Sequence, residues 1–177
     1  SDLKLFINDY NLESDWDDNK KLKSLIHWIQ RWEKDGVTKI DGIGTQMHVS
    51  YSANATSQKS KEEHVVKMFE LLAASGKLVK ISELDMGYID ENGKTLKTVN
   101  MTQDQHKAMA EFYKFIVKKY FEIIPVAQQY GITTWSITDS PDSSSSFWRA
   151  GEPIGLWDLN YYRKHEYAGY ADGLAGK

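Results

Sequence analysis

The chain has 177 residues, of which 41% are hydrophobic and 27% are charged, a composition sufficient for one globular domain with a buried core. The formal net charge of -3 provides no basic field for nucleic acid, and no apolar run is long enough to span a bilayer. We therefore expect neither a nucleic-acid partner nor a membrane partner. The absence of cysteine excludes disulfides and thiolate metal sites.

The first half of the chain alternates between strand patterns and amphipathic helix patterns. Gly36 and Gly76 follow two helical stretches, and glycine is the residue most typical of a helix C-terminus. The order of elements predicted here is a strand at 3–10, a helix at 19–34, a strand at 40–49 and a helix at 62–74.

The second half repeats the alternation. A strand is predicted at 80–86, followed by a polar loop and a long helix that opens at Thr102 with a Thr-x-x-Gln capping pattern. Pro125 is expected to break this helix on its way towards Gly131. A fourth strand at 132–138, a Ser-rich loop and a helix at about 165–174 complete the chain.

Four strands that are each followed by a helix indicate parallel β/α construction. Alternation alone fits an open doubly wound sheet or part of a barrel, but the first strand lacks the Gly-rich turn of a nucleotide-binding open sheet. Functional residues that follow the carboxyl ends of the strands favour a TIM (β/α)8 barrel, which has eight strands, so this chain supplies about half of one. These polar or aromatic residues are Asn8, Asp9, Tyr10, Asn11, Gln46, His48, Glu83, Asp85, Trp135 and Asp139.

The segment KISELDM, residues 80–86, places two carboxylates, Glu83 and Asp85, on one face of a strand with apolar flanks. A buried charge is retained only when it is paired, hydrogen-bonded or used in chemistry. Neighbouring side chains on one strand cannot flank a substrate bond from opposite sides, so they are not expected to be a catalytic pair. We expect Asp85 to support His48, which in turn supports Glu83.

Four segments carry a resemblance to a known family: LFINDYN, DGIGTQMH, KISELDM and GITTWSITDSPDSSSSFWRAGEPIGLWDLNYYRKHEYAGYADGL. In this order they resemble the fifth to eighth strands of the family 10 glycoside hydrolases, the endo-1,4-β-xylanases. The resemblance implies that residues 1–177 are the C-terminal half of a catalytic (β/α)8 barrel. It implies a secreted, periplasmic or cell-surface retaining xylanase that needs no cofactor.

The resemblance also implies site residues. The nucleophile would be Glu83, supported by His48 and Asp85, while the acid/base Glu would follow the fourth strand of an N-terminal half. Substrate contacts are expected at Trp135, which the family uses as a wall of the sugar site, and at Gln46, Trp148, Tyr10 and Asn11.

Each of these residues also has a structural interpretation. Gln46 would cap a strand end, Tyr10 and Asn11 would make loop hydrogen bonds, and Trp148 would anchor its loop. Trp135 would pack in the core, and His48 would make a structural hydrogen bond or contact the substrate directly. Glu83 and Asp85 would form a buried ion-pair network. A metal site made of His48, Glu83 and Asp85 is a further alternative, but nothing supplies more His ligands, and we expect no metal.

Two functions of different class follow. In the first, the chain is part of a xylanase that acts on xylan or xylo-oligosaccharides, with Glu83 as nucleophile and an N-terminal half of the same barrel as partner. In the second, it is a non-catalytic half-barrel that binds polysaccharide or self-associates, for example as a homodimer, because the open edges of a half-barrel recruit another chain.

Overall fold

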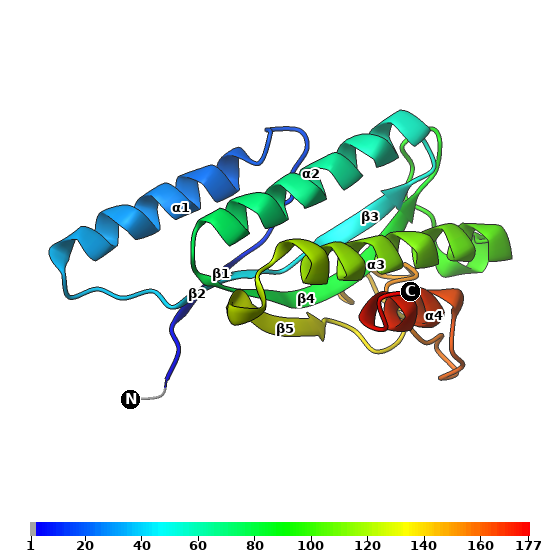
Figure 1. The fold of residues 1–177 in the computed structure, drawn as a ribbon. Coiled ribbons are helices and arrows are strands. Elements are labelled where there is room, and N and C mark those ends of the chain that lie inside the picture. Colours follow the sequence, from blue (N-terminus) through cyan, green and yellow to red (C-terminus); the bar gives the residue numbers. More distant parts are fainter. Residues whose placement is uncertain (1–2) are drawn as a thin grey trace. The chain divides into compact units, whose positions relative to one another are not determined.

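The computed structural model describes residues 3–177, which contain five strands and four α-helices in the order β1, α1, β2, β3, α2, β4, α3, β5, α4 (Figure 1). Two compact units are present. The first is made of residues 3–47, Ser60–Leu84 and Lys119–Thr133, and the second of His48–Lys59, Asp85–Lys118 and Thr134–Lys177. The strand β4, Leu78–Ile89, runs through both units.

The first unit contains a parallel sheet. Strand β1, Phe6–Asp9, pairs with β2, Gly42–Thr45, and β2 pairs with the first half of β4. Strand β5, Gln129–Thr134, also pairs with β4. The register places Asn8 opposite Gly44. The parallel β/α construction predicted from the sequence is confirmed for the β1–β2 and β2–β4 pairs.

Helices α1, Lys20–Trp32, and α2, Ala55–Ala74, lie side by side in Figure 1. The buried Asn19 joins them in the first unit, because its side-chain amide donates to the carbonyl oxygen of His64 at 3.1 Å. Apolar side chains of α1 and α2 build the core against the sheet, among them Leu22, Ile29, Met68, Phe69 and Leu72.

The second unit is built on β3, His48–Ser52, which pairs in parallel with the second half of β4 and places His48 opposite Asp85. Helix α3, Gln103–Ile123, begins with the predicted capping box. Thr102 Oγ1 accepts from the N–H of Gln105 at 3.3 Å, and Gln105 Oε1 accepts from the N–H of Thr102 at 2.8 Å. Helix α4, His165–Leu174, has the predicted bounds.

The strand predicted at 40–49 is wrong as a single element. The chain leaves β2 at Thr45 and enters β3 at His48, because Met47 takes a left-handed conformation with φ 57°. His48 therefore begins a strand and does not end one. The strand predicted at 3–10 is also shorter, since β1 covers only Phe6–Asp9.

Two further boundaries differ from those predicted. Helix α2 begins at Ala55, seven residues before the predicted start, because Asn54 Oδ1 accepts the N–H of Ser57 and caps the first turn. The last strand, predicted at 132–138, is Gln129–Thr134, so Trp135 follows the strand. The phenol oxygen of Tyr120 accepts the N–H groups of Tyr130 and Gly131 at 3.0 Å, which fixes the early start of β5.

Within residues 3–177, every helix is too short or too polar to cross a membrane.

An ion pair between Lys77 and Glu33 makes the stability of the first unit depend on pH. Lys77 Nζ donates to Glu33 Oε1 at 2.6 Å, and the N–H of Ile40 donates to the same oxygen at 3.0 Å. These bonds lower the pKa of Glu33 below its ordinary value of 4.5, although desolvation opposes them. The ion pair therefore stabilises the fold above pH 4.5, and this contribution is lost as pH falls through the lowered pKa.

We expect Glu33→Gln to lower the free energy of unfolding at pH 7 by about 1 kcal/mol or less, because the pair is partly exposed. The difference from the unaltered protein should close as the pH falls below 4.5. Urea unfolding between pH 7 and pH 3 measures it, with Glu91→Gln on an exposed turn as the control. A difference that stays constant with pH would contradict this role for Glu33.

Candidate functional site

Glu83 lies on β4 in the first unit, where Asn8 of β1 orients its carboxylate. Asn8 Nδ2 donates to Glu83 Oε1 at 3.1 Å, and Asn8 Oδ1 accepts from Ser82 Oγ at 2.6 Å. The amide crosses over Gly44, where an added Cβ would lie 2.5 Å from Asn8 Oδ1. A side chain on β2 at this position would displace Asn8, so the glycine permits the contact with Glu83.

Asp85 lies on the part of β4 that belongs to the second unit, and its side chain has no exposed surface. Its Oδ2 accepts from Trp148 Nε1 at 2.7 Å and lies 3.1 Å from His48 Nδ1. Its Oδ1 accepts from Arg149 Nη1 at 3.0 Å. The predicted contact between Asp85 and His48 is therefore present, together with two partners that were not predicted.

Arg149 is the residue that the sequence did not indicate. Its guanidinium binds Asp85 and also donates to the carbonyl oxygen of Val49, the hydroxyl of Ser50 and the carboxylate of Glu152. An added Cβ at Gly87 would lie 1.9 Å from Arg149 Nη2, so β4 leaves room for the guanidinium only because this residue is glycine. Arg149 also has φ 49°, which a pattern-based reading cannot anticipate for a non-glycine residue.

This environment decides what Asp85 can do. A carboxylate with no exposed surface and three partners cannot approach a sugar, so Asp85 is suited to holding His48 and Trp148 in place. The interpretation of Asp85 as part of a buried ion-pair network applies to its bond with Arg149. The two interpretations are compatible, because Oδ2 of Asp85 faces the imidazole and the indole while Oδ1 binds Arg149.

Two half-exposed tryptophans surround His48 in the second unit. The ring of Trp148 lies 4.8 Å from the imidazole centre, and the ring of Trp135 lies 5.8 Å from it in an edge-to-face arrangement. Trp135 is 53% exposed and Trp148 is 49% exposed, so about half of each residue is accessible to solvent. Open aromatic faces beside a fixed imidazole are suited to stacking on the apolar face of a sugar ring.

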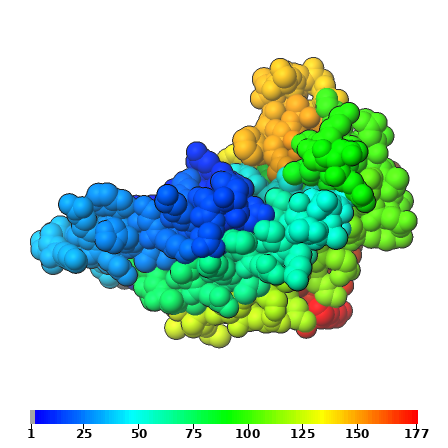
Figure 2. All heavy atoms as spheres, turned by 90° about the horizontal axis from the view of Figure 1, so that it is seen from above, coloured from blue at the N-terminus to red at the C-terminus, as the bar shows by residue number. Residues whose placement is uncertain are grey.

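The loop that carries Trp148, predicted from the sequence as a Ser-rich loop, is anchored at several points. Ser140 Oγ donates to the carbonyl oxygen of Trp148 at 2.7 Å, and the N–H of Thr98 donates to the carbonyl oxygen of Gly151 at 2.8 Å. In Figure 2 the loop, in gold and orange, lies against the green segment that contains Lys97, whose ammonium pairs with Asp142. The structure therefore shows that the loop of Trp148 is anchored, while substrate contact by Trp148 stays a prediction.

The other predicted contact residues, Tyr10, Asn11 and Gln46, belong to the first unit. Lys21 Nζ lies 3.6 Å above the ring of Tyr10 and donates to the Tyr10 carbonyl oxygen, which supports the loop interpretation of this residue. Asn11 has φ 56° and follows Tyr10 in the same turn. Gln46 donates its backbone N–H to the carbonyl oxygen of Asp9, which continues the β1–β2 pairing.

Across residues 3–177, no group of three His, Asp or Glu side chains is arranged to hold a metal ion. The metal site considered for His48, Glu83 and Asp85 therefore gains no geometric support.

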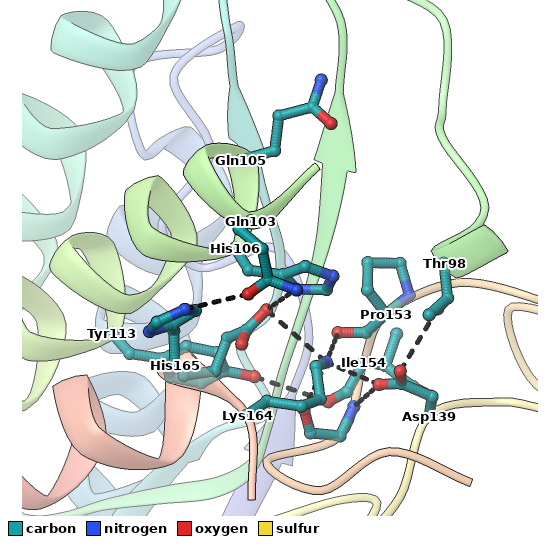
Figure 3. Close-up of polar contacts among 12 residues, drawn as sticks. Thr98, Gln103, Gln105, His106, Tyr113, Asp139, Pro153, Ile154, Lys164 and His165 are labelled. Carbon is teal, nitrogen blue, oxygen red and sulfur yellow. Dashed lines mark hydrogen bonds and ion pairs between the residues drawn. The ribbon is translucent and has the colours of Figure 1, made fainter. Parts of the chain in front are cut away.

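A second polar cluster in the second unit surrounds Lys164 (Figure 3). Lys164 Nζ donates to Asp139 Oδ1 at 2.6 Å and to the carbonyl oxygens of Pro153 and Gly155, and it lies 3.5 Å from Glu166 Oε1. Burial raises the pKa of Asp139, an effect that Lys164 opposes. Asp139, which the sequence placed among the residues that end strands, is thus part of a buried network that fixes the chain before α4.

Comparisons with known proteins place this geometry in a family. The model of glycosyl hydrolase family 10 matches residues 1–173. This chain belongs to glycosyl hydrolase family 10. The assignment confirms the resemblance found in the sequence, and the fold of the family is the (β/α)8 barrel.

Individual family 10 relatives are similar over almost the whole chain. The endo-β-1,4-xylanase Xyn10C of Cellvibrio japonicus is 31% identical over 97% of this chain, which spans 28% of that relative. Xylanase 10C from the same organism, solved in complex with xylopentaose, has a TM-score of 0.76 at 27% identity; the match covers 99% of this chain and 34% of that one.

Another solved relative is described as the intracellular xylanase of Thermoanaerobacterium saccharolyticum and was solved in complex with xylotetraose. It has a TM-score of 0.69 at 25% identity, and the match covers 95% of this chain and 44% of that one. In each of these comparisons the chain spans less than half of the relative. The description of this relative as intracellular means that family membership does not assign a secreted location.

Proposed function

We propose that residues 1–177 are the C-terminal half of the catalytic barrel of a retaining endo-1,4-β-xylanase. The observation that carries the proposal is the half-buried Glu83 on β4 of a family 10 chain, with its carboxylate oriented by Asn8. Most of the relatives that match over nearly the whole chain are named as xylanases, and three of the solved ones hold xylo-oligosaccharides.

In this mechanism Glu83 attacks the anomeric carbon and forms a covalent glycosyl-enzyme intermediate. A second carboxyl about 5 to 5.5 Å away first protonates the leaving oxygen and then removes a proton from the attacking water. Asp85 does not fit this second role, because its side chain is fully buried and bound to Arg149, Trp148 and His48. We assign the role to a Glu of the part of the barrel that lies outside residues 1–177.

The same proposal assigns the binding residues. Trp135 and Trp148 provide open aromatic faces for a xylose ring, and Asp85 holds His48 and the Trp148 indole in fixed positions. His48 is assigned the support of Glu83. Gln46, Tyr10 and Asn11 are assigned contacts with sugar hydroxyls, Tyr10 and Asn11 on the side of the leaving group.

The test is hydrolysis of xylan and xylohexaose by the protein that contains residues 1–177. We expect cleavage at internal bonds, and we expect proton NMR to show the β-anomer of the new reducing end before mutarotation begins, because two displacements retain configuration. Carboxymethyl cellulose provides the control polysaccharide and should be cleaved more slowly. Initial release of the α-anomer would contradict the assignment of Glu83 as a nucleophile.

One observation favours the second candidate function, a half-barrel that binds polysaccharide without cleaving it or that self-associates. Within residues 3–177, β1 pairs with β2 on one side only, and Leu3 and Leu5 before it are 72% and 51% exposed. An open strand edge of this kind recruits another strand, from the same barrel or from a second copy. Binding of xylohexaose without any product in the experiment above would favour this function.

A further inference from the structure

The second unit contains a groove of about 470 Å³ that is lined by both tryptophans beside His48. Phe147 and Tyr161 line the same groove. Its volume, and its lining of aromatic and aliphatic side chains with a few polar residues, Ser136, Thr138, Asp139 and Ser140, match those of small-molecule binding sites in general.

The aromatic side chains of this groove are unusually exposed. Phe147 is 45% exposed and Tyr161 is 74% exposed, in addition to the half-exposed Trp135 and Trp148. Large apolar side chains that gather on one surface of a protein generally mark a binding site.

Tyr161 is held in its exposed position at a conformational cost. It has φ 63°, a left-handed conformation that is rare for a bulky side chain. Asp158 maintains this turn, because its Oδ1 accepts the N–H groups of Asn160 at 2.8 Å and Tyr162 at 2.9 Å, and its backbone carbonyl accepts the N–H of Tyr161 at 3.0 Å. Strain of this kind persists where the surrounding structure fixes it, and it points to a functional role for the residue that carries it.

Phe147 is also fixed. Its backbone N–H donates to the carbonyl oxygen of Ser144 at 3.3 Å, and the next residue, Trp148, is anchored through its indole to Asp85. The two outer aromatic rings therefore lie on backbone that is ordered before any ligand binds. A preformed platform loses little conformational entropy on binding.

We propose that Phe147 and Tyr161 form an additional sugar-binding position that continues the platform of Trp135 and Trp148 along a β-1,4-linked xylose chain. The proposal rests on the proposed function, because it takes xylo-oligosaccharide as the ligand. The ligand is inferred from the shared groove. Trp135 and Trp148 line the same groove as Phe147 and Tyr161, so a sugar chain that stacks on the tryptophans can extend to the other two rings within it. The position formed by Phe147 and Tyr161 should contribute to affinity only for xylose chains that are long enough to reach it.

The test compares ligands of two lengths. Binding of xylotriose and xylohexaose is measured by titration calorimetry in the protein that contains this chain, with Glu83→Gln present to prevent turnover. We expect Phe147→Ala and Tyr161→Ala each to weaken binding of xylohexaose roughly three- to tenfold and to leave xylotriose unchanged. Tyr161→Phe, which keeps the ring, should retain the affinity.

Tyr162→Ala provides the matched control, because Tyr162 is 72% exposed and adjacent in sequence but does not line the groove. Equal losses for xylotriose and xylohexaose, or losses no larger than those of Tyr162→Ala, would overturn the proposal. A lower melting temperature without a length-dependent change in affinity would also overturn it, since it would mean that another part of the protein covers the groove. If the Glu83→Gln protein with no substitution in the groove bound neither xylotriose nor xylohexaose, that result would instead contradict the proposed function.

Discussion

Glu83→Gln is expected to abolish xylan hydrolysis while sugar binding is largely kept. The substitution preserves the size of the side chain and a hydrogen-bond acceptor for Asn8, but it removes the carboxylate that forms the covalent bond. Loss of a covalent nucleophile lowers turnover by about 10⁴-fold or more. Turnover of an aryl xylobioside and of xylan, together with calorimetric binding of xylohexaose, measures the two effects separately.

Glu111→Gln on the exposed side of α3 is the matched control for this experiment, because it removes a carboxylate of the same type outside the proposed site. Its turnover should equal that of the unaltered protein. Near-normal turnover by the Glu83→Gln variant would remove Glu83 from the mechanism. Loss of both turnover and binding, accompanied by a lower melting temperature, would mean that Glu83 has a structural role on β4.

Lys164→Met is expected to lower the free energy of unfolding more than Glu33→Gln or Lys107→Met does. The Lys164 side chain is 7% exposed, and its ammonium faces Asp139 and Glu166, which are 1% and 0% exposed. Methionine fills a similar volume but leaves the buried Asp139 carboxylate without its cation, which costs about 3–5 kcal/mol, whereas Glu166 keeps its contact with His106 at 2.6 Å. For a chain of this size the melting temperature should fall by on the order of 10 °C.

Lys107→Met is the control for Lys164→Met. Lys107 pairs with Asp104 on an exposed surface, where the two side chains are 59% and 89% exposed and solvent screens their attraction, so this substitution should leave the stability almost unchanged. Combining Lys164→Met with Asp139→Asn should cost less than the sum of the single variants, because the asparagine carries no charge that needs a partner. A Lys164→Met variant as stable as Lys107→Met would show that the cluster in Figure 3 is accessible to water.

The sequence by itself determined the features that depend on local pattern. The last helix, His165–Leu174, and the capping box at Thr102 were predicted as the structure has them, because both depend on residues within a few positions of one another. The parallel β/α order and the family also follow from the sequence, since ordered motifs such as KISELDM retain the family pattern.

Only the tertiary structure decided where the elements break and which side chains meet. The break at Met47 depends on a left-handed residue that is not glycine, so no turn signal marks it. Arg149 reaches Asp85 across 64 positions, and Asn8 reaches Glu83 across 75. Such contacts arise from the packing of distant segments, and periodicity and residue propensity report only on neighbours along the chain. The sequence therefore indicated the carboxylates Glu83 and Asp85, whereas the fold determined that Asp85 is buried and that Arg149 is its partner.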